Sequence, residues 1–121
     1  MINVYQVTFT DAQVNEINSA ATAPDYFTAY CTATLTGDVY PAWNMGLYDH
    51  VADVSVDDLE TAFMVMNRWD DVDEKLVKRL KPLHSMSVGD IVINKDLAPD
   101  KYTEYAVAPV GFSPLKLSWE K

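Results

Sequence analysis

The stretch from residue 27 to residue 36, FTAYCTATLT, alternates apolar and polar side chains at every position. Strict alternation is typical of a β-strand that buries one face and exposes the other. Cys31 falls on the apolar side of this pattern, and residues 1–67 contain no basic group to stabilise its thiolate. We therefore expect a half-buried strand over residues 27–36, with Cys31 as a packing residue rather than a nucleophile.

Other segments rich in β-branched and aromatic residues also predict strands. They cover residues 2–9, 47–54, 89–93 and 102–110, and a short edge strand is expected within residues 111–119. Strands are therefore expected near both ends of the chain.

Helix signals lie between these segments. Thr10 and Gln13 form a T-x-x-Q capping box, which predicts a short helix directly after Thr10. Ser55 and Asp58 form a similar S-x-x-D box at the start of a segment that extends to residue 69. Its apolar side chains recur at helical spacing and predict one buried stripe, made by Leu59, Ala62, Phe63 and Met66.

A further helix is expected over residues 71–80, where apolar residues recur every four positions and acidic residues precede basic ones. Pro82 would end it. Strands at both ends and helices between them predict an α+β fold: a small single domain of residues 1–121 with two or three helices packed on one face of an antiparallel-rich sheet.

The formal charge is unevenly distributed along the chain. Residues 1–67 contain nine acidic residues and no Lys or Arg, whereas residues 68–121 contain nine of each kind, so the net charge of −9 belongs to the first part. Such a field attracts basic partners and repels nucleic acid and anionic membranes. We expect no direct contact with DNA, RNA or membrane.

Acidic and aromatic side chains in the middle of the chain are the predicted contacts for a protein partner with a basic surface. Exposed Trp and Tyr among acids suit a binding hot spot, although most aromatic residues must fill the core, and acids at a helix start often serve as caps. The predicted contact residues are Asp49, Asp53, Asp57, Asp58, Glu60, Asp70, Asp71, Trp43, Tyr48 and Trp69.

Residues 83–93, LHSMSVGDIVI, contain the residue types of a hydrolase site. A serine nucleophile of the G-x-S-x-G kind needs a sharp strand–turn–helix, but Ser85 and Ser87 precede a predicted strand. We expect a turn instead, in which Gly89 takes a positive φ. A small hydrolase that uses Ser85, Ser87 and His84 is the enzymatic alternative.

Neither a metal nor a cofactor is expected, because the sequence has no C-x-x-C, H-E-x-x-H, EF-hand or glycine-rich phosphate-binding motif. No apolar run approaches the ~20 residues of a membrane span, and the N-terminus lacks a basic leader. With one cysteine, a soluble protein of the cytoplasm is expected.

Part of the chain, about residues 48–115, resembles the YodL-like domain. The most specific features are the segment HSMSVGD at residues 84–90 and the pair Gly111-Phe112. Residues before 48 do not align with that family. YodL-like domains occur in phages and mobile elements, often beside host-interaction domains, and no catalytic activity is established for them. The resemblance implies a phage or mobile-element accessory protein and carries over no active-site residues.

These observations predict a non-enzymatic accessory protein that binds and inhibits or modulates a host protein, such as a defence or nucleic-acid-processing factor, through an acidic surface. Nucleic-acid mimicry, in which carboxylates take the place of phosphates, is one form of this hypothesis. The alternative is a structural or assembly module whose acidic surface serves solubility. Either a monomer or a homodimer is compatible with the sequence.

Overall fold

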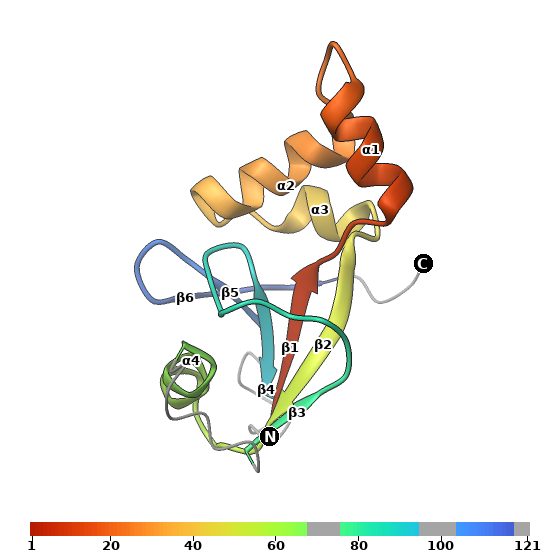
Figure 1. Ribbon diagram of the computed structural model, residues 1–121. Helices are drawn as coiled ribbons and strands as arrows, with labels where there is room; N and C mark the ends of the chain where they lie inside the picture. Colours follow the sequence, from red (N-terminus) through yellow and green to blue (C-terminus); the bar gives the residue numbers. More distant parts are fainter. Residues whose placement is uncertain (68–75, 95–103, 118–121) are drawn as a thin grey trace.

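The computed structural model describes residues 1–67, 76–94 and 104–117 (Figure 1). These residues form an α+β domain, as the sequence predicted, and they contain six strands and four helices. In chain order the elements are β1 (Ile2–Val7), α1 (Asp11–Ser19), α2 (Asp25–Thr36), α3 (Tyr40–Asn44), β2 (Tyr48–Val54), α4 (Leu59–Asn67), β3 (Val77–Arg79), β4 (Ile91–Asn94), β5 (Glu104–Val107) and β6 (Phe112–Pro114).

The strands form one sheet in the order β3-β2-β1-β4-β5-β6, and every neighbouring pair is antiparallel. The N-terminal strand β1 lies inside the sheet because it pairs with both β2 and β4. Four strands fall within segments that were predicted as strands: β1, β2, β5 and the edge strand β6. Strand β4 overlaps its predicted segment, residues 89–93, and ends one residue later, at Asn94.

Both faces of the sheet are covered, because side chains of β1 alternate between two hydrophobic clusters. Ile2 and Val4 pack with α4, whereas Tyr5 and Val7 pack with α2 and α3. Figure 1 shows α1–α3 gathered at one end of the sheet and α4 apart from them. The sequence predicted the helices on one face of the sheet, but α2 and α3 pack on one face and the predicted helix α4 packs on the other.

The predicted strand over residues 27–36 is wrong, because these residues belong to helix α2. Its threonines suit a helix as well as a strand, since their hydroxyls bond to carbonyl oxygens one turn earlier. The Thr32 hydroxyl donates to the Thr28 carbonyl oxygen at 3.0 Å, and the Thr36 hydroxyl donates to that of Thr32 at 2.6 Å. Gly37, with φ of 82°, ends the helix in the left-handed conformation.

The apolar side of the same segment also fits a helix. Ala29 and Ala33 are four residues apart, lie on one helical face and are both buried. Their small size allows the helix to approach Gly89 closely, because a Cβ atom at Gly89 would lie 2.8 Å from the Ala33 carbonyl. Cys31 is half-buried, whereas Leu35, which the strand pattern placed in the core, is exposed.

The predicted helix over residues 71–80 is wrong where the structure describes it. Val77–Arg79 form strand β3, in which Val77 pairs with Val54 of β2 and enters the core. Residues 71–75 lie outside the described part of the chain. The four-residue apolar repeat predicted a helix with Leu76 and Leu80 on one face. Pairing with the edge of β2 favours a strand instead.

The helix starts are partly as predicted. At α1 the capping box is confirmed: the Gln13 N–H donates to the Thr10 hydroxyl at 3.1 Å, and the Thr10 N–H donates to the Gln13 side chain at 2.8 Å. At α4 the predicted box of Ser55 and Asp58 does not form. Asp58 is itself the cap, because its carboxylate accepts from the Thr61 N–H and from the Thr61 hydroxyl, both at 2.8 Å.

Candidate functional site

A β-bulge shapes the surface that carries several predicted contact residues. In the pairing of β1 with β2, Tyr5 lies opposite His50 and the adjacent Val4 lies opposite Ala52. Val51 is therefore an extra residue in β2. Beyond it, the alternation of side chains along β2 is reversed.

This reversal separates two of the predicted acids. Asp49 pairs with Gln6 and Asp53 pairs with Asn3, and these β1 partners are three positions apart on a regularly alternating strand. Asp49 and Asp53 consequently lie on opposite faces of the sheet, although a regular strand would place residues four apart on the same face. They cannot form one acidic surface.

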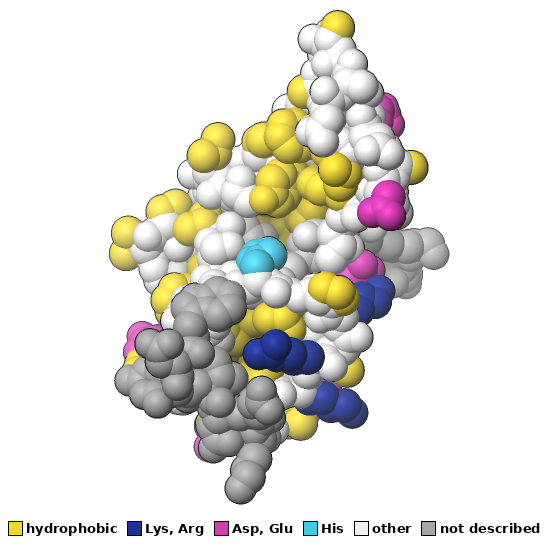
Figure 2. Space-filling model, viewed as in Figure 1, with side chains coloured by type: hydrophobic (Ala, Val, Ile, Leu, Met, Phe, Trp, Pro, Cys, Tyr) yellow, Lys and Arg dark blue, Asp and Glu magenta, His cyan; other side chains and the backbone are white. Residues whose placement is uncertain are grey.

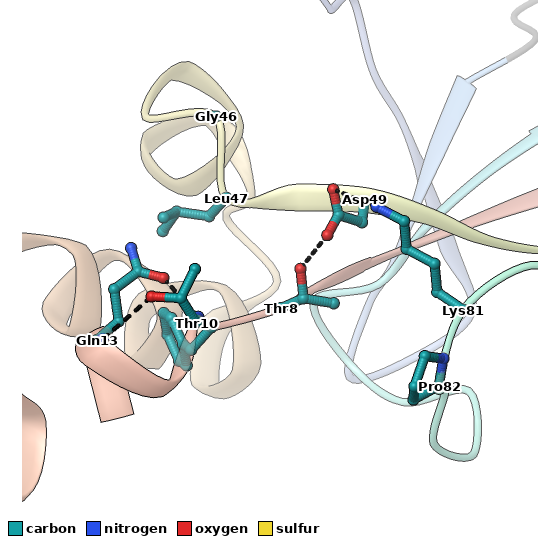
Figure 3. A pocket seen from close by; sticks show the side chains of 9 residues that line it. Thr8, Thr10, Gln13, Gly46, Leu47, Asp49, Lys81 and Pro82 are labelled. Atoms are coloured by element: carbon teal, nitrogen blue, oxygen red, sulfur yellow. Dashed lines mark hydrogen bonds and ion pairs between the residues drawn. The ribbon is translucent and has the colours of Figure 1, made fainter. Parts of the chain in front are cut away.

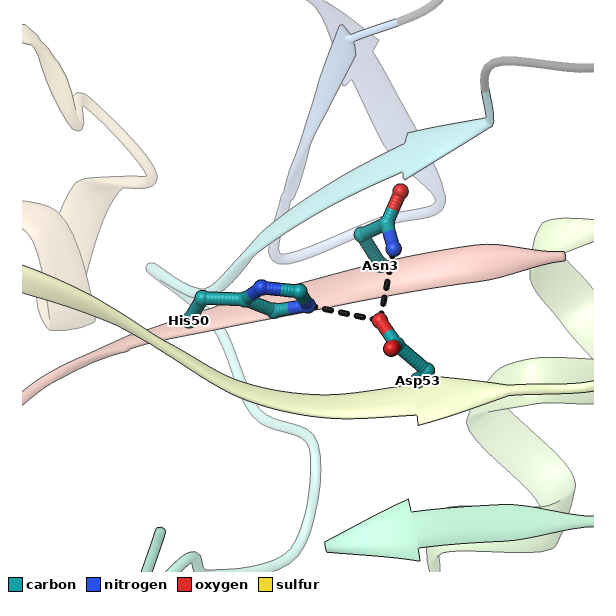
Figure 4. A network of polar contacts seen from close by, with 3 residues as sticks. All are labelled: Asn3, His50 and Asp53. Atoms are coloured by element: carbon teal, nitrogen blue, oxygen red, sulfur yellow. Dashed lines mark hydrogen bonds and ion pairs between the residues drawn. The ribbon is translucent and has the colours of Figure 1, made fainter. Parts of the chain in front are cut away.

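Asp53 is engaged in a polar network with its neighbours (Figure 4). One carboxylate oxygen accepts from the Asn3 amide at 2.6 Å and lies 2.6 Å from His50 Nε2. The His50 ring in turn stacks on Tyr5, with ring centroids 4.9 Å apart. Burial alone would raise the pKa of Asp53, but the bonds to Asn3 and His50 outweigh it and lower the pKa. The network holds β1 and β2 together.

Asp49 lies beside a pocket of about 690 Å³ between the end of β1, the start of α1 and residues 81–82 (Figure 3). Its carboxylate accepts from the Thr8 hydroxyl and lies 3.3 Å from Lys81 Nζ. Thr10 and Gln13, which also line the pocket, bond to each other in the capping box. These polar groups are already paired, so the pocket gives little indication of a ligand.

The predicted surface aromatics Trp43 and Tyr48 belong to the core, contrary to expectation. Both are buried, with ring centroids 5.9 Å apart. The Tyr48 hydroxyl donates to the Gly89 carbonyl oxygen, and burial raises the pKa of Tyr48. The remaining predicted contacts, Trp69, Asp70 and Asp71, lie outside the described residues.

The HSMSVGD segment forms a turn held by a buried carboxylate. Asp90 accepts from the Ser87 N–H and from the Gln6 amide, both at 3.0 Å. Burial raises the pKa of Asp90 to about 6, although the Ser87 and Gln6 hydrogen bonds and the nearby His84 limit the rise. The predicted positive φ of Gly89 is confirmed, at 92°.

The same segment does not assemble the expected features of a hydrolase site. His84 Nδ1 lies 2.6 Å from the backbone carbonyl oxygen of Ser85, and the His84 backbone bonds to Gln6 in both directions. Within the described residues, no hydrogen bond joins the imidazole to the hydroxyl of Ser85 or Ser87. The geometry therefore favours a structural role for the segment.

The remaining predicted acids lie together at the start of α4. Asp57, Asp58 and Glu60 are all exposed. Asp58 is occupied as the helix cap, and hydrogen bonds from Thr61 lower its pKa. The carboxylates of Asp57 and Glu60 have no hydrogen bond or ion pair to any described residue and are available to a partner.

An apolar groove of about 410 Å³ lies between α4 and the β5–β6 hairpin, and Glu60 is part of its lining. At its side, Met64 is 50% exposed, and Val110 at the hairpin tip is 92% exposed. Figure 2 shows hydrophobic side chains along the corresponding margin of the molecule. We call it the α4 groove; its lining residues are Glu60, Phe63, Met64, Val107, Ala108, Pro109, Gly111 and Phe112.

Sequence reasoning missed most of the α4 groove. Phe63 was expected in the buried stripe, and Met64, Val110 and Phe112 were not singled out. The available signal was the run AFMVM at residues 62–66, which is wider than the single apolar stripe needed to bury one helical face. An apolar surface on the outer side of a helix often marks an interaction site.

Comparison of the chain with protein-family models, curated proteins and solved structures finds no match. Across the described ranges, no group of three or more His, Cys, Asp or Glu side chains is placed to hold a metal ion. None of the helices in that part of the chain is long and apolar enough to cross a membrane.

Proposed function

We propose that this protein is a non-catalytic binding protein whose partner is a protein with a basic surface. The contact surface consists of the α4 groove and the carboxylates of Asp57 and Glu60, together called the α4 surface. The observation that carries the proposal is an exposed apolar groove whose lining includes the Glu60 carboxylate, with the exposed Asp57 three residues earlier in the chain; neither carboxylate makes an ion pair to described residues.

This arrangement resembles the anatomy of protein interfaces, in which an apolar centre is surrounded by a polar rim. The groove provides area to remove from water, and the carboxylates provide orientation and faster association with a cationic partner. Strand β3, which carries the exposed Lys78 and Arg79, is at the opposite edge of the sheet from β5 and β6. These bases are therefore distant in the sheet order from the hairpin that lines the groove.

The resemblance of residues 48–115 to YodL-like domains supports a more specific proposal. The protein would act as a phage or mobile-element accessory factor, and the partner would be a host protein that it inhibits or modulates. Ordinary protein binding has more support than nucleic-acid mimicry, because Asp49 and Asp53 lie on opposite faces and are both already paired.

The test is capture of partners from a bacterial lysate by the tagged chain of residues 1–121, at salt from about 50 mM to about 500 mM. We expect at least one captured protein to be lost on substitution of Asp57→Asn with Glu60→Gln, and to be released as salt rises. The matched control replaces two exposed acids on α1 and α2, Asp11→Asn with Asp25→Asn. Capture that ignores salt, or falls equally in both variants, contradicts the proposal.

A further inference from the structure

Resting on the proposed function, we propose that the partner element recognised by the α4 groove is an amphipathic helix with an apolar ridge and flanking Lys or Arg side chains. The groove lies between a helix and a hairpin, and its lining is almost entirely apolar. Phe63 and Met64 form one side and Pro109 and Phe112 the other. Apolar side chains projecting from a partner would therefore be the anchors.

A helix fits this groove better than an added strand. The residues that flank β6 face β5 and the turn after it, since the Gly111 carbonyl oxygen accepts from the Ala108 N–H at 3.0 Å and the Leu115 N–H donates to the Glu104 carbonyl oxygen at 2.8 Å. By alternation, Phe112 and Pro114 direct their backbone groups outward. Pro114 has no N–H, so an added strand would lack a donor there. A helix satisfies its own backbone and needs only side-chain contacts.

The charges specify the flanks of this helix. Among the described residues, Glu60 is the single ionisable residue in the lining. Asp57 is exposed three residues earlier in the chain, and Asp58 is engaged with Thr61 and contributes less to a partner. A Lys or Arg side chain beside the apolar ridge would meet Glu60, which a neutral or acidic helix would leave unpaired.

Fluorescence anisotropy of the chain of residues 1–121 with labelled peptides tests this inference. The probe is a Leu/Lys peptide of about 14 residues with leucines at i, i+3, i+4 and i+7; the controls have the same composition in shuffled order or in strict alternation. We expect the helical peptide to bind about tenfold more tightly than either control and to gain helicity on binding, as measured by circular dichroism.

Two substitutions locate the binding. Met64→Gln is expected to weaken binding of the helical peptide about fivefold, whereas Met45→Gln leaves it unchanged. The two methionines are matched, since Met64 is 50% exposed and Met45 is 49% exposed at the end of α3. Thermal melts establish that both variants remain folded. Glu60→Gln should weaken binding at low salt more than at high salt.

Several outcomes would overturn the inference. Equal binding of the shuffled peptide would indicate attraction by charge alone, tighter binding of the alternating peptide would indicate strand addition, and equal effects of Met64→Gln and Met45→Gln would exclude the groove. A lysate partner that needs the α4 surface but is not displaced by the helical peptide refutes this inference and leaves the proposed function intact. Specific peptide binding without any such partner refutes the proposed function instead.

Discussion

The His50 imidazole and the Asp53 carboxylate meet at 2.6 Å on one face of β2, although residues three apart in a regular strand point to opposite faces. The extra residue Val51 makes this contact possible, because it shifts the alternation by one position. The bulge therefore creates the network of Asn3, His50 and Asp53 and at the same time removes Asp49 from that face.

Substitution of Asp53→Ala should lower the free energy of unfolding by about 1 kcal/mol near neutral pH, since it removes the charged acceptor of Asn3 and His50. The folded state lowers the pKa of this carboxyl, so the contribution is present above its ordinary pKa and lost as pH falls through the lower, folded-state value. Urea unfolding of both proteins near neutral pH and in acid checks this. A difference that grows on acidification would contradict it.

Asp90 should show the opposite pH dependence. Its pKa in the folded state is raised to about 6, so the folded protein holds this proton more tightly than the unfolded chain does. Wild-type stability should therefore fall as pH rises from about 4 to about 7, by up to roughly 3 kcal/mol for a shift of roughly two pKa units. The Asp90→Asn variant lacks this titrating carboxyl. Its free energy of unfolding relative to wild type should therefore increase as pH rises over the same range. A difference in unfolding free energy between the two proteins that stays constant with pH, as measured in urea, would refute the raised pKa of Asp90.

Gly89→Ala should be strongly destabilising, by about 2–4 kcal/mol, because it combines a φ of 92° with a Cβ atom placed 2.8 Å from the Ala33 carbonyl. Gly111→Ala is the matched control. Its φ is 71°, but nothing lies within 4 Å of an added Cβ atom. Only the conformational cost of about 1 kcal/mol applies there. Equal losses in thermal or urea unfolding would mean that α2 does not approach the turn closely.

The start of α4 is tested by a pair of substitutions. Asp58→Ala should destabilise the protein clearly more than Ser55→Ala does, because it removes the acceptor of the Thr61 N–H and hydroxyl. Ser55→Ala should change stability by no more than about 0.5 kcal/mol, since the described contact of Ser55 is a backbone bond to Leu76. A larger loss of stability for Ser55→Ala would indicate that the predicted capping box of Ser55 and Asp58 does form.

Most strands of the sheet were predictable because β-branched runs bounded by turn residues carry a local signal, as in IVIN of β4. Helix α2 was not, because alternating Thr and apolar residues satisfy both structures. Placing Ala29 and Ala33 against Gly89 is a tertiary contact that no window of sequence contains. Residues 77–79 also form a strand because of a contact between distant parts of the chain, which is the pairing of β3 with β2.

The candidate site was only partly predictable. The acids at the start of α4 were identified from the sequence, and their capping role was considered. The face of Asp53 was not predictable, because the bulge at Val51 occurs in an uninterrupted strand pattern without Gly or Pro. Phe63 and Phe112 line the same α4 groove although they are far apart in the chain. No local window of sequence contains both, so the groove could not be predicted.

The position of β1 inside the sheet has a consequence for biosynthesis. Ile2–Val7 are synthesised before both of their neighbouring strands, which are complete only when residues 54 and 94 have been added. Strand β1 must therefore remain without its second neighbour until β4 has been translated. Until then its valines and isoleucine are exposed to chaperones and to other chains.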